Sequence, residues 1–517
     1  MVLVRAKPSW VTTALHLALL GLLALAFRLP SVEIPFDNDS GAIAYHARLI
    51  LGGEPLYLTH HPAHHLPGAY YTYAAIFGIL GDGYRSVKIA LVFWVWVTAW
   101  VIYQIGRELG NRSVGLAAAI LFIGVSSLTR LFGDTGQIEL FANLPLSLVI
   151  LAGLRARRNQ GGLPAYFLTG LLGGIAFLYK AIYLSSLFAV AVMLLAETLT
   201  GNDNPKWRRL ALRWFGMAAG FLAPLAIVLA YFYAAGALSR LLLVFTLGVG
   251  YLGSQLPVIA IPALPLVMLW RVVAVFAFLA VAGLVQTGYR LPKLYRSRSP
   301  QAAEGTLLLA WSLASLLVAG ASRFYFEHYA LLLVPPFAIV VAAYAVEFAA
   351  QARGHAWAAF FGKAVPAGIL LAVLANLFWA SGPYYGAYLR YKSGQIAYDR
   401  FLLDGPYQGG NYFAASRVAG YLRDHSQPGD TVLAWTALAQ VNYLSGRRSS
   451  SDVLWTGYIP ALGPPGRVFD PEPLYVVVGW TLTEGTEIPL WLRDELADNY
   501  VRETTIENQT LYRRLTP

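Results

Sequence analysis

Residues 10–27 read WVTTALHLALLGLLALAF, an apolar run that contains no Asp, Glu, Lys or Arg. A helix needs about 20 mostly apolar residues to cross the hydrocarbon core of a bilayer, so this run predicts a first membrane span. The chain continues with Arg28-Leu29-Pro30 and shows no small-residue cleavage site. We therefore expect the span to be retained rather than removed as a signal peptide.

The composition of the whole chain also indicates a membrane protein. Of its 517 residues, 57% are hydrophobic and 13% are charged, whereas soluble domains carry about 25% charged residues. The same length criterion predicts further spans. They lie near residues 87–105, 113–129, 140–154, 163–180, 182–199, 211–235, 258–286, 305–321, 328–347 and 364–381. The expected fold is an α-helical polytopic membrane protein with about eleven transmembrane helices.

Lysine and arginine predict the orientation, because short cytoplasmic loops carry more of them than outer loops do. If Arg5 and Lys7 are cytoplasmic, the loops after the even-numbered spans are cytoplasmic too, and these loops are basic. Their basic residues are Arg107/Arg112, Arg155/Arg157/Arg158, Lys206/Arg208/Arg209, Arg290/Lys293/Arg296/Arg298 and Arg353/Lys363. The formal charge of +11 therefore reflects topology and contact with membrane lipid, and we expect no nucleic-acid partner. We expect a multi-pass protein of the plasma (inner) membrane.

An odd number of spans places the C-terminal part of the chain on the outer, extracytoplasmic side. From about residue 382 the apolar runs shorten and turn sequences such as Gln427-Pro428-Gly429-Asp430 occur. The pattern predicts a helix over 412–423 and buried strands over 431–435 and 475–478. We predict a transmembrane domain over 1–381 and a small soluble α/β domain over 382–517. The chain has no Cys, which excludes disulfides, thiolate metal sites and cysteine nucleophiles.

The first outer loop, residues 28–86, is long for a connection between spans and begins with an acidic pair. Asp37 and Asp39 stand in the sequence Phe36-Asp37-Asn38-Asp39-Ser40-Gly41, just before a helical pattern. One interpretation is that Asp39 or Ser40 caps this helix. Another is that a carboxylate at the membrane surface acts as a general base. The two are compatible, because a cap position fixes a carboxylate in place.

The same loop holds four of the nine histidines, His60, His61, His64 and His65. Their i,i+4 spacing would let two imidazoles share a metal ion on a helix. Pro62, however, favours a helix start, which would break both pairs and place His64 and His65 in the first turn, where backbone N–H groups attract an anion. Phosphate contact, plain surface histidines and a metal site all stay open as interpretations.

Further polar residues stand at the outer ends of other predicted spans. Glu139 opens an apolar span, where it could simply stabilise the helix N-terminus, and Lys180 lies at an outer turn, where a lysine that reaches the membrane surface would look the same. Arg323, Tyr325 and His328 lie in the segment that joins two later spans. An aromatic belt explains the rings of that segment but not its charges.

Together these residues suit an inverting attack on a lipid-linked sugar phosphate. A carboxylate would take the proton of the acceptor hydroxyl, and cations would stabilise the charge that develops on the leaving phosphate. Aromatic side chains can stack on sugar faces or border the lipid. The candidates that line the substrate are Tyr45, Tyr70, Tyr71 and Tyr325.

Four motifs in sequence order make the chain resemble the C-type (GT-C) membrane glycosyltransferases, in particular the branch of protein O-mannosyltransferases and the lipid A aminoarabinose transferase. The resemblance covers roughly residues 10–350, and the order of the motifs is more specific than any one of them. The motifs are Asp37-Asn38-Asp39-Ser40, Leu51-Gly52-Gly53-Glu54-Pro55-Leu56-Tyr57, His65-Leu66-Pro67-Gly68, and Arg323 to Tyr329 followed by Pro335-Pro336.

The resemblance implies that Asp39 is the catalytic base, with Asp37 as the alternative, and that Glu139 is the second-loop acid. It further implies that Lys180 and Arg323 are the outer basic residues, and that helices lie along the membrane over 39–51 and 64–80. The chain departs from the family pattern at Ser40, which replaces Glu, and at Leu66 and Gly68, which replace Lys and Pro. His64 or His65 would then contact the donor phosphate, and donor binding would change with pH at about 6.5.

The leading hypothesis is a transferase that moves a sugar from a polyprenyl-phosphate donor to a glycan, lipid or protein acceptor. A lipid or sugar transporter is one alternative, which would place charges in mid-span and show an internal repeat. A catalytically inactive glycan- or lipid-binding relative is the other. We expect no obligatory cofactor. A divalent metal, held by Asp37, Asp39 and Glu139 or by the four histidines, is the less favoured possibility.

Overall fold

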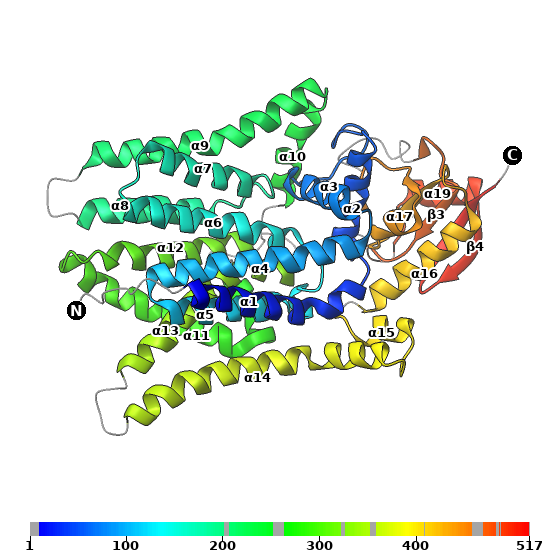
Figure 1. The fold of residues 1–517 in the computed structure, drawn as a ribbon. Helices are drawn as coiled ribbons and strands as arrows, with labels where there is room; N and C mark the ends of the chain where they lie inside the picture. Colours follow the sequence, from blue (N-terminus) through cyan, green and yellow to red (C-terminus); the bar gives the residue numbers. More distant parts are fainter. Residues whose placement is uncertain are drawn as a thin grey trace.

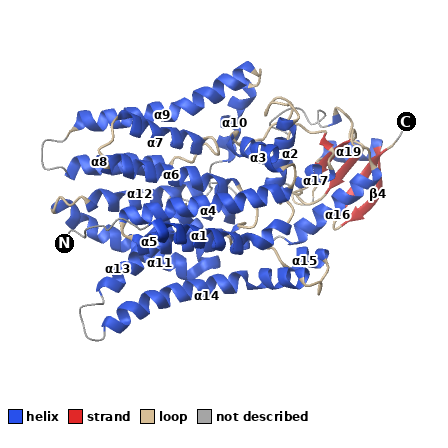
Figure 2. Ribbon diagram, in the orientation of Figure 1, coloured by secondary structure: helices blue, strands red, loops and turns tan. Residues whose placement is uncertain are grey.

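The computed structural model describes residues 10–200, 206–251, 263–321, 326–351, 358–407, 409–456, 469–481, 485 and 487–515. Its long helices run side by side in one bundle, and the strands gather in a small domain at one end (Figures 1 and 2). The bundle helices are α1 (Trp10–Arg28), α4 (Tyr84–Leu109), α5 (Arg112–Ser126), α6 (Ile138–Arg158), α7 (Leu163–Phe177), α8 (Ser185–Thr200), α9 (Trp207–Ala234), α10 (Leu238–Tyr251), α11 (Ala263–Arg296), α12 (Gln301–Gly320), α13 (Val334–Gln351) and α14 (Ala358–Lys392).

A helix occupies every span that the sequence predicts, within the described residues. Seven helical segments of the described chain are long and apolar enough to cross a membrane, which confirms a polytopic helical protein. The number of crossings stays a prediction, because α5, α7 and α8 are shorter than the 18 residues of that criterion. The helix α10 was not predicted. The helix α14 continues through the predicted domain boundary at 381 to Lys392, and that boundary also stays a prediction.

Two shorter helices, α2 (Asn38–Leu51) and α3 (Gly68–Leu80), follow the first span and lie at the same end of the bundle as the strands (Figure 1). The helix α2 agrees with the prediction, whereas α3 begins four residues later than residue 64. The reason is local packing. Ala63 adopts a left-handed φ of 53°, and the Gly68 N–H donates to the Leu178 carbonyl at 2.7 Å, so the chain turns here before it becomes helical.

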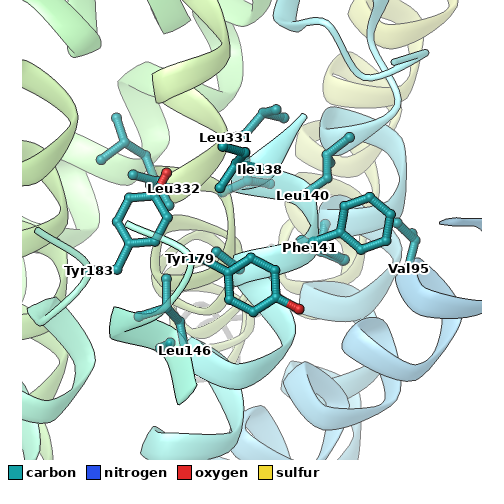
Figure 3. Packing of buried hydrophobic residues seen from close by; sticks show 14 of the residues in the cluster. Val95, Ile138, Leu140, Phe141, Leu146, Tyr179, Tyr183, Leu331 and Leu332 are labelled. Atoms are coloured by element: carbon teal, nitrogen blue, oxygen red, sulfur yellow. The ribbon is translucent and has the colours of Figure 1, made fainter. Parts of the chain in front are cut away.

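The helix α6 runs through the interior of the bundle. Ile138, Leu140, Phe141 and Leu146 of α6 pack with Val95 of α4, with Tyr179 and Tyr183 of the turn before α8, and with Leu331 and Leu332 of the 3-10 helix Glu327–Leu333 (Figure 3). This packing surrounds the first turn of α6 with protein. Glu139, which lies in that turn, is therefore only 2% exposed.

The C-terminal domain is an α/β domain, as predicted. Its sheet has the strand order β2-β1-β3-β5-β4, in which β1 pairs in parallel with β2 and β3, and β5 pairs antiparallel with β3 and β4. The strands are β1 (Thr431–Trp435), β2 (Arg448–Ser449), β3 (Tyr475–Val478), β4 (Tyr500–Ile506) and β5 (Gln509–Arg514), and the helices are α15 (Tyr398–Asp404), α16 (Gly409–His425), α17 (Gln440–Ser445) and α19 (Leu490–Asn499).

The C-terminal domain docks on the first loop through the residues around α17 and β2. The Asn38 side chain at the start of α2 accepts a hydrogen bond from the Ala439 N–H at 2.8 Å. The Tyr443 hydroxyl donates to Asp82 at 2.6 Å, and Arg448 forms two hydrogen bonds to the Glu54 carboxylate at 2.8 and 2.9 Å. These contacts come from several parts of both segments, so they fix the domain against the loop.

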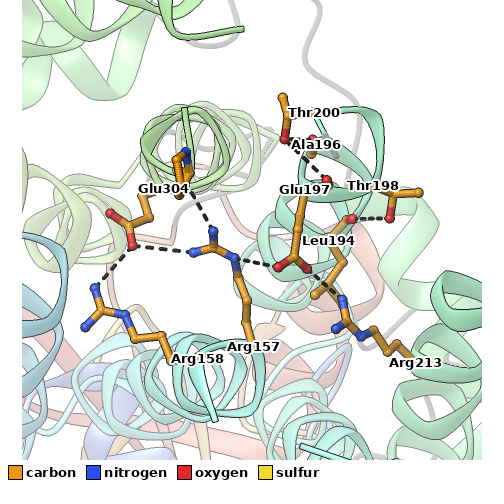
Figure 4. A network of polar contacts seen from close by, with 10 residues as sticks. Arg157, Arg158, Leu194, Ala196, Glu197, Thr198, Thr200, Arg213 and Glu304 are labelled. Atoms are coloured by element: carbon orange, nitrogen blue, oxygen red, sulfur yellow. Dashed lines mark hydrogen bonds and ion pairs between the residues drawn. The ribbon is translucent and has the colours of Figure 1, made fainter. Parts of the chain in front are cut away.

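The opposite end of the bundle, which we call the arginine end, carries an ion-pair network (Figure 4). Glu304 lies between Arg157, at 3.4 Å, and Arg158, at 3.1 Å. Glu197 likewise lies between Arg157, at 3.3 Å, and Arg213, at 2.6 Å. Arg158 also pairs with Glu108 of α4. The network joins the ends of α4, α6 and α8 to the starts of α9 and α12, so it holds five helices in place.

The helices α7 and α9 approach each other through glycines, as membrane helices often do. A Cβ atom added at Gly170 would overlap the Met217 carbonyl oxygen, whereas one added at Gly382 of α14 would meet no atom within 4 Å. We expect Gly170→Ala to destabilise the protein by about 1–3 kcal/mol, because α7 and α9 would have to move apart. Thermal unfolding in detergent, with Gly382→Ala as the matched control, measures this. Equal melting temperatures for the two variants would contradict the close approach.

Candidate functional site

Asp37 caps the N-terminus of α2. One carboxylate oxygen accepts hydrogen bonds from the Ser40 N–H, at 3.3 Å, and from the Ser40 hydroxyl. The other oxygen accepts from the Gln137 side-chain amide at 2.7 Å. The residue is 2% exposed. Because both oxygens have partners within the protein, the Asp37 carboxylate is fixed in place.

Asp39 lies in the first turn of α2 and is half-buried. Burial, together with the negative charges of Asp37 and Glu139, raises the pKa of the Asp39 carboxyl to about 7. Hydrogen bonds from Trp455 and Gln137 oppose that shift. A general base works best when its pKa lies near the operating pH, so Asp39 has the accessibility and the proton affinity that this task needs.

Glu139 and Lys180 form a buried pair beside these aspartates. Glu139 accepts a hydrogen bond from the Tyr183 hydroxyl at 2.6 Å, and the Lys180 Nζ lies 3.9 Å from the same oxygen. The ammonium also lies 4.5 Å from the centre of the Tyr329 ring. Its positive charge acts on Asp39 as well as on Glu139. One cation therefore faces two of the three carboxylates.

The loop before α6 is held by two buried cations of the membrane helices. Arg28 of α1 donates to the carbonyl oxygens of Gly133, at 2.6 Å, and Ser126, at 2.8 Å. Lys88 of α4 donates to the carbonyl oxygen of Asp134, and its charge stabilises the ionised form of Asp37. These bonds fix the loop so that Gln137, at its end, reaches Asp37.

The C-terminal domain contributes Trp455 to the same region. Its indole lies nearly parallel to the His46 ring, at 15° and 6.5 Å between centroids, and contacts the His65 ring edge-on at 5.3 Å. It also donates the hydrogen bond that favours the ionised form of Asp39. A residue of the C-terminal domain thus stands beside a carboxylate of the first loop.

The comparisons with known proteins agree with this arrangement. Residues 60–231 match the family model described as dolichyl-phosphate-mannose-protein mannosyltransferase. ArnT from Cupriavidus metallidurans, solved bound to undecaprenyl phosphate, is similar with a TM-score of 0.58 and 14% identity, covering 98% of this chain and 99% of that one. Its apo structure gives a TM-score of 0.60 at 13% identity, with 98% of each chain covered. The protein has a C-type glycosyltransferase fold.

A second C-type structure supports that statement. The oligosaccharyltransferase AglB from Archaeoglobus fulgidus, solved with an inhibitory peptide and a dolichol-phosphate, has a TM-score of 0.55 and 12% identity, covering 91% of this chain and 70% of that one. A comparison with curated protein sequences found no match. The resemblance predicted from the order of motifs is confirmed at the level of the C-type fold and of the mannosyltransferase family model.

Within this C-type fold, the acidic and basic residues predicted from the sequence do come together. Asp37, Asp39, Glu139 and Lys180 meet where α2, α6 and the turn before α8 converge, and His328 lies close enough to interact electrostatically with Glu139 and Lys180. His328 packs edge-on against Phe132 and stacks on Phe326. Arg323 and Tyr325 lie outside the described residues. The functional roles of all these residues stay predictions.

The histidines of the first loop contact different groups in the C-type fold, although the rings of His64 and His65 stay adjacent, with centroids 4.2 Å apart. The ring of His60 lies 3.2 Å from the Tyr45 hydroxyl and 3.3 Å from the Ser449 carbonyl, while His61 contacts the Arg240 carbonyl at 2.8 Å. His65 contacts the Tyr70 hydroxyl at 3.0 Å. Burial lowers the pKa of His64 and of His65 well below 6.5. Both rings are therefore neutral near pH 7. The prediction that they respond to pH near 6.5 is wrong, because their pKa values lie well below that pH.

The described residues do not provide a set of ligands for a metal ion. Among the described residues, no three of the types His, Cys, Asp and Glu form a group that could hold one. Asp37 already uses both oxygens on Ser40 and Gln137, and His60, His61 and His65 contact different partners. The residues present do not fit either metal site considered from the sequence.

The tyrosines predicted to line the substrate differ in their burial and in their hydrogen-bond partners. The Tyr45 hydroxyl accepts the Ser449 N–H at 2.9 Å, so it joins α2 to the C-terminal domain, and Tyr70 is fully buried. The half-buried Tyr71 donates to the Tyr231 hydroxyl at 3.2 Å. Sequence reasoning missed Lys88, Gln137 and Trp455. Only Lys88 gave a signal, as a charge within an apolar run.

The Lys180–Glu139 pair yields a stability prediction. Removing one member of a buried ion pair leaves an uncompensated charge, whereas removing both does not. We expect Lys180→Met to destabilise the protein by about 3 kcal/mol, and Lys180→Met combined with Glu139→Gln to recover most of that loss. Thermal unfolding in detergent measures both, with the exposed Lys293→Met as a control. A double variant no more stable than Lys180→Met would show that the two side chains are not coupled.

Proposed function

We propose that the protein transfers a sugar from a polyprenyl-phosphate-linked donor to an acceptor hydroxyl on the outer face of the membrane, with inversion at the sugar carbon. The observation that carries the proposal is the environment of Asp39. It is a half-buried carboxylate with a pKa near 7, set beside fixed acids and a buried lysine. Asp39 accepts the proton of the acceptor hydroxyl as that oxygen attacks the sugar.

The leaving group of this reaction is a lipid phosphate, which gains negative charge as the sugar departs. Lys180 lies 3.9 Å from Glu139 and its charge also acts on Asp39, and it stabilises the charge of the leaving phosphate. His64 and His65, being neutral, contribute hydrogen bonds rather than charge. In this proposal Arg323 adds a second positive charge from the segment before His328.

The proposed side of the membrane follows from the charges at the two ends of the bundle. The arginine end, with Arg157, Arg158 and Arg213, lies opposite α2, α3 and the C-terminal domain (Figure 1). Since cytoplasmic loops are rich in Arg and Lys, the arginine end is cytoplasmic in this proposal. Asp39 and the C-terminal domain are then extracytoplasmic.

The structural relatives support the donor class. ArnT is described bound to undecaprenyl phosphate and AglB bound to a dolichol-phosphate, and both are polyprenyl phosphates. The matching family model is described by a dolichyl-phosphate-linked sugar donor. The acceptor is a glycan, a lipid or a protein, and the labelled product of a transfer assay identifies which.

The test is transfer of radiolabelled sugar from polyprenyl-phosphate donors into a membrane extract by the purified protein in nanodiscs. We expect Asp39→Asn to lower the transfer rate by about 10²–10⁴-fold, the usual contribution of a general base, while donor binding is retained. The exposed Asp494→Asn is the control. Donor binding without transfer by the wild type would favour an inactive binding relative, and absence of both would favour a transporter. An acceptor bond of retained configuration would refute inversion.

The pH dependence tests the role of Asp39 independently. The base must be ionised, so kcat/KM should fall as the pH decreases below about 7. Trp455→Phe removes the indole N–H that favours the ionised carboxylate, so the acidic limb should move to higher pH while Asp37, Glu139, Lys180 and Tyr70 stay in place around Asp39. The exposed Trp480→Phe serves as the control. A wild-type limb near pH 4, the ordinary range of an aspartate, would contradict the raised pKa of Asp39. A limb that Trp455→Phe leaves unmoved would rule Asp39 out as the titrating base.

A further inference from the structure

A pocket opens at the arginine end, between the start of α7 and the start of α9, far from Asp39. It measures about 320 Å³ and is lined by residues that include Gly162, Leu163, Tyr166, Arg209, Leu212 and Arg213. Pockets that hold small ligands start at about this size. The proposed transfer reaction uses none of these residues.

The N-terminus of α7 forms one wall of this pocket. Its N-cap residue is Gly162, which makes no side-chain cap hydrogen bond, and a proline follows in the first turn. Pro164 has no N–H and the Ala165 N–H donates to the Gly162 carbonyl at 3.1 Å, so the helix dipole, more than free N–H groups, favours an anion at this end. Gly161 and Gly162 have no side chain that would cover this end of the helix.

A buried hydroxyl provides a second, independent sign of a ligand. Tyr166, in the first turn of α7, is only 1% exposed, and its hydroxyl oxygen is buried with no hydrogen-bond partner among the described residues. An unpaired buried hydroxyl is costly. Because Tyr166 lines the pocket, a polar group bound there would supply the missing hydrogen bond.

Two arginines of α9 give the pocket its charge. Arg213 lies over the Tyr166 ring at 5.3 Å and is held by its ion pair with Glu197 at 2.6 Å. Arg209 is exposed and pairs with no acid in the described part of the chain. Arg209 is thus the cation available to a bound anion, and Arg213 adds its field from a fixed position.

The apolar residues that line the pocket indicate what kind of molecule carries the anionic group. Leu163 and Leu212, which border the pocket, are 48% and 53% exposed, and Trp207 at the start of α9 is 52% exposed. Exposed leucines and a tryptophan beside arginines are typical of the membrane interface. We infer that this pocket binds the phosphate group of an anionic membrane lipid, whose chains lie along α7 and α9.

The inference is tested on the full-length protein in detergent by native mass spectrometry, with phosphatidylglycerol as the probe and phosphatidylcholine and inorganic phosphate as comparison ligands. We expect preferential binding of phosphatidylglycerol. Arg209→Gln should weaken it about tenfold, as loss of a hydrogen bond to a charged group does, and Tyr166→Phe should weaken it severalfold. Arg296→Gln, which removes an exposed charge at the same end, should leave it unchanged.

Three results would overturn the inference. Equal affinity for both phospholipids, or equal effects of Arg209→Gln and Arg296→Gln, would mean that the pocket has no specific lipid-phosphate site. Displacement of phosphatidylglycerol by inorganic phosphate at equal concentration would mean that the anion is soluble rather than lipid-borne. Sugar transfer is measured separately on the same variants, so the outcome here does not depend on the proposed reaction.

Discussion

The structure depends on the cost of burying three carboxylates, those of Asp37, Asp39 and Glu139, wholly or in part at one end of an apolar bundle. An ionised group that leaves water must be paired or hydrogen-bonded, and each acid here meets that requirement differently. Asp37 is bound by Ser40 and Gln137, and Glu139 by Tyr183 and Lys180. Asp39 keeps part of its surface accessible. Burial and the charges of Asp37 and Glu139 raise the pKa of its carboxyl, and burial raises the pKa of Asp37 as well.

These requirements explain why separate parts of the chain must meet at one end of the bundle. Arg28 and Lys88 fix the loop that carries Gln137. The turn between α7 and α8 supplies Lys180 and Tyr183, and Gly68 allows the first loop to pack on the backbone of that turn. A shift in any of these segments would leave a buried carboxylate without its partner. The packing that gives each buried carboxylate its partner is therefore the same packing that assembles the site.

The C-terminal domain packs on the first loop and contributes a residue to the site. The contacts of Asn38, Tyr443 and Arg448 hold it on the first loop, and the segment that follows carries Trp455 to Asp39. The opposite end of the bundle uses charge differently. There Glu197 and Glu304 are shared among three arginines, so pairing joins helices instead of tuning a carboxylate.

The sequence by itself determined the helical membrane fold and the strands at 431–435 and 475–478, and it indicated Asp37, Asp39, Glu139 and Lys180 as candidates, which the structure brings together. Hydropathy and strand patterns are local, and charges next to apolar runs are visible without a structure. Only the tertiary structure decided that His60, His61 and His65 take different partners, that α3 begins at Gly68, and that Trp455 lies beside Asp39 across more than four hundred residues of chain. Partners of buried groups are chosen by packing between distant segments, and no local pattern records that choice.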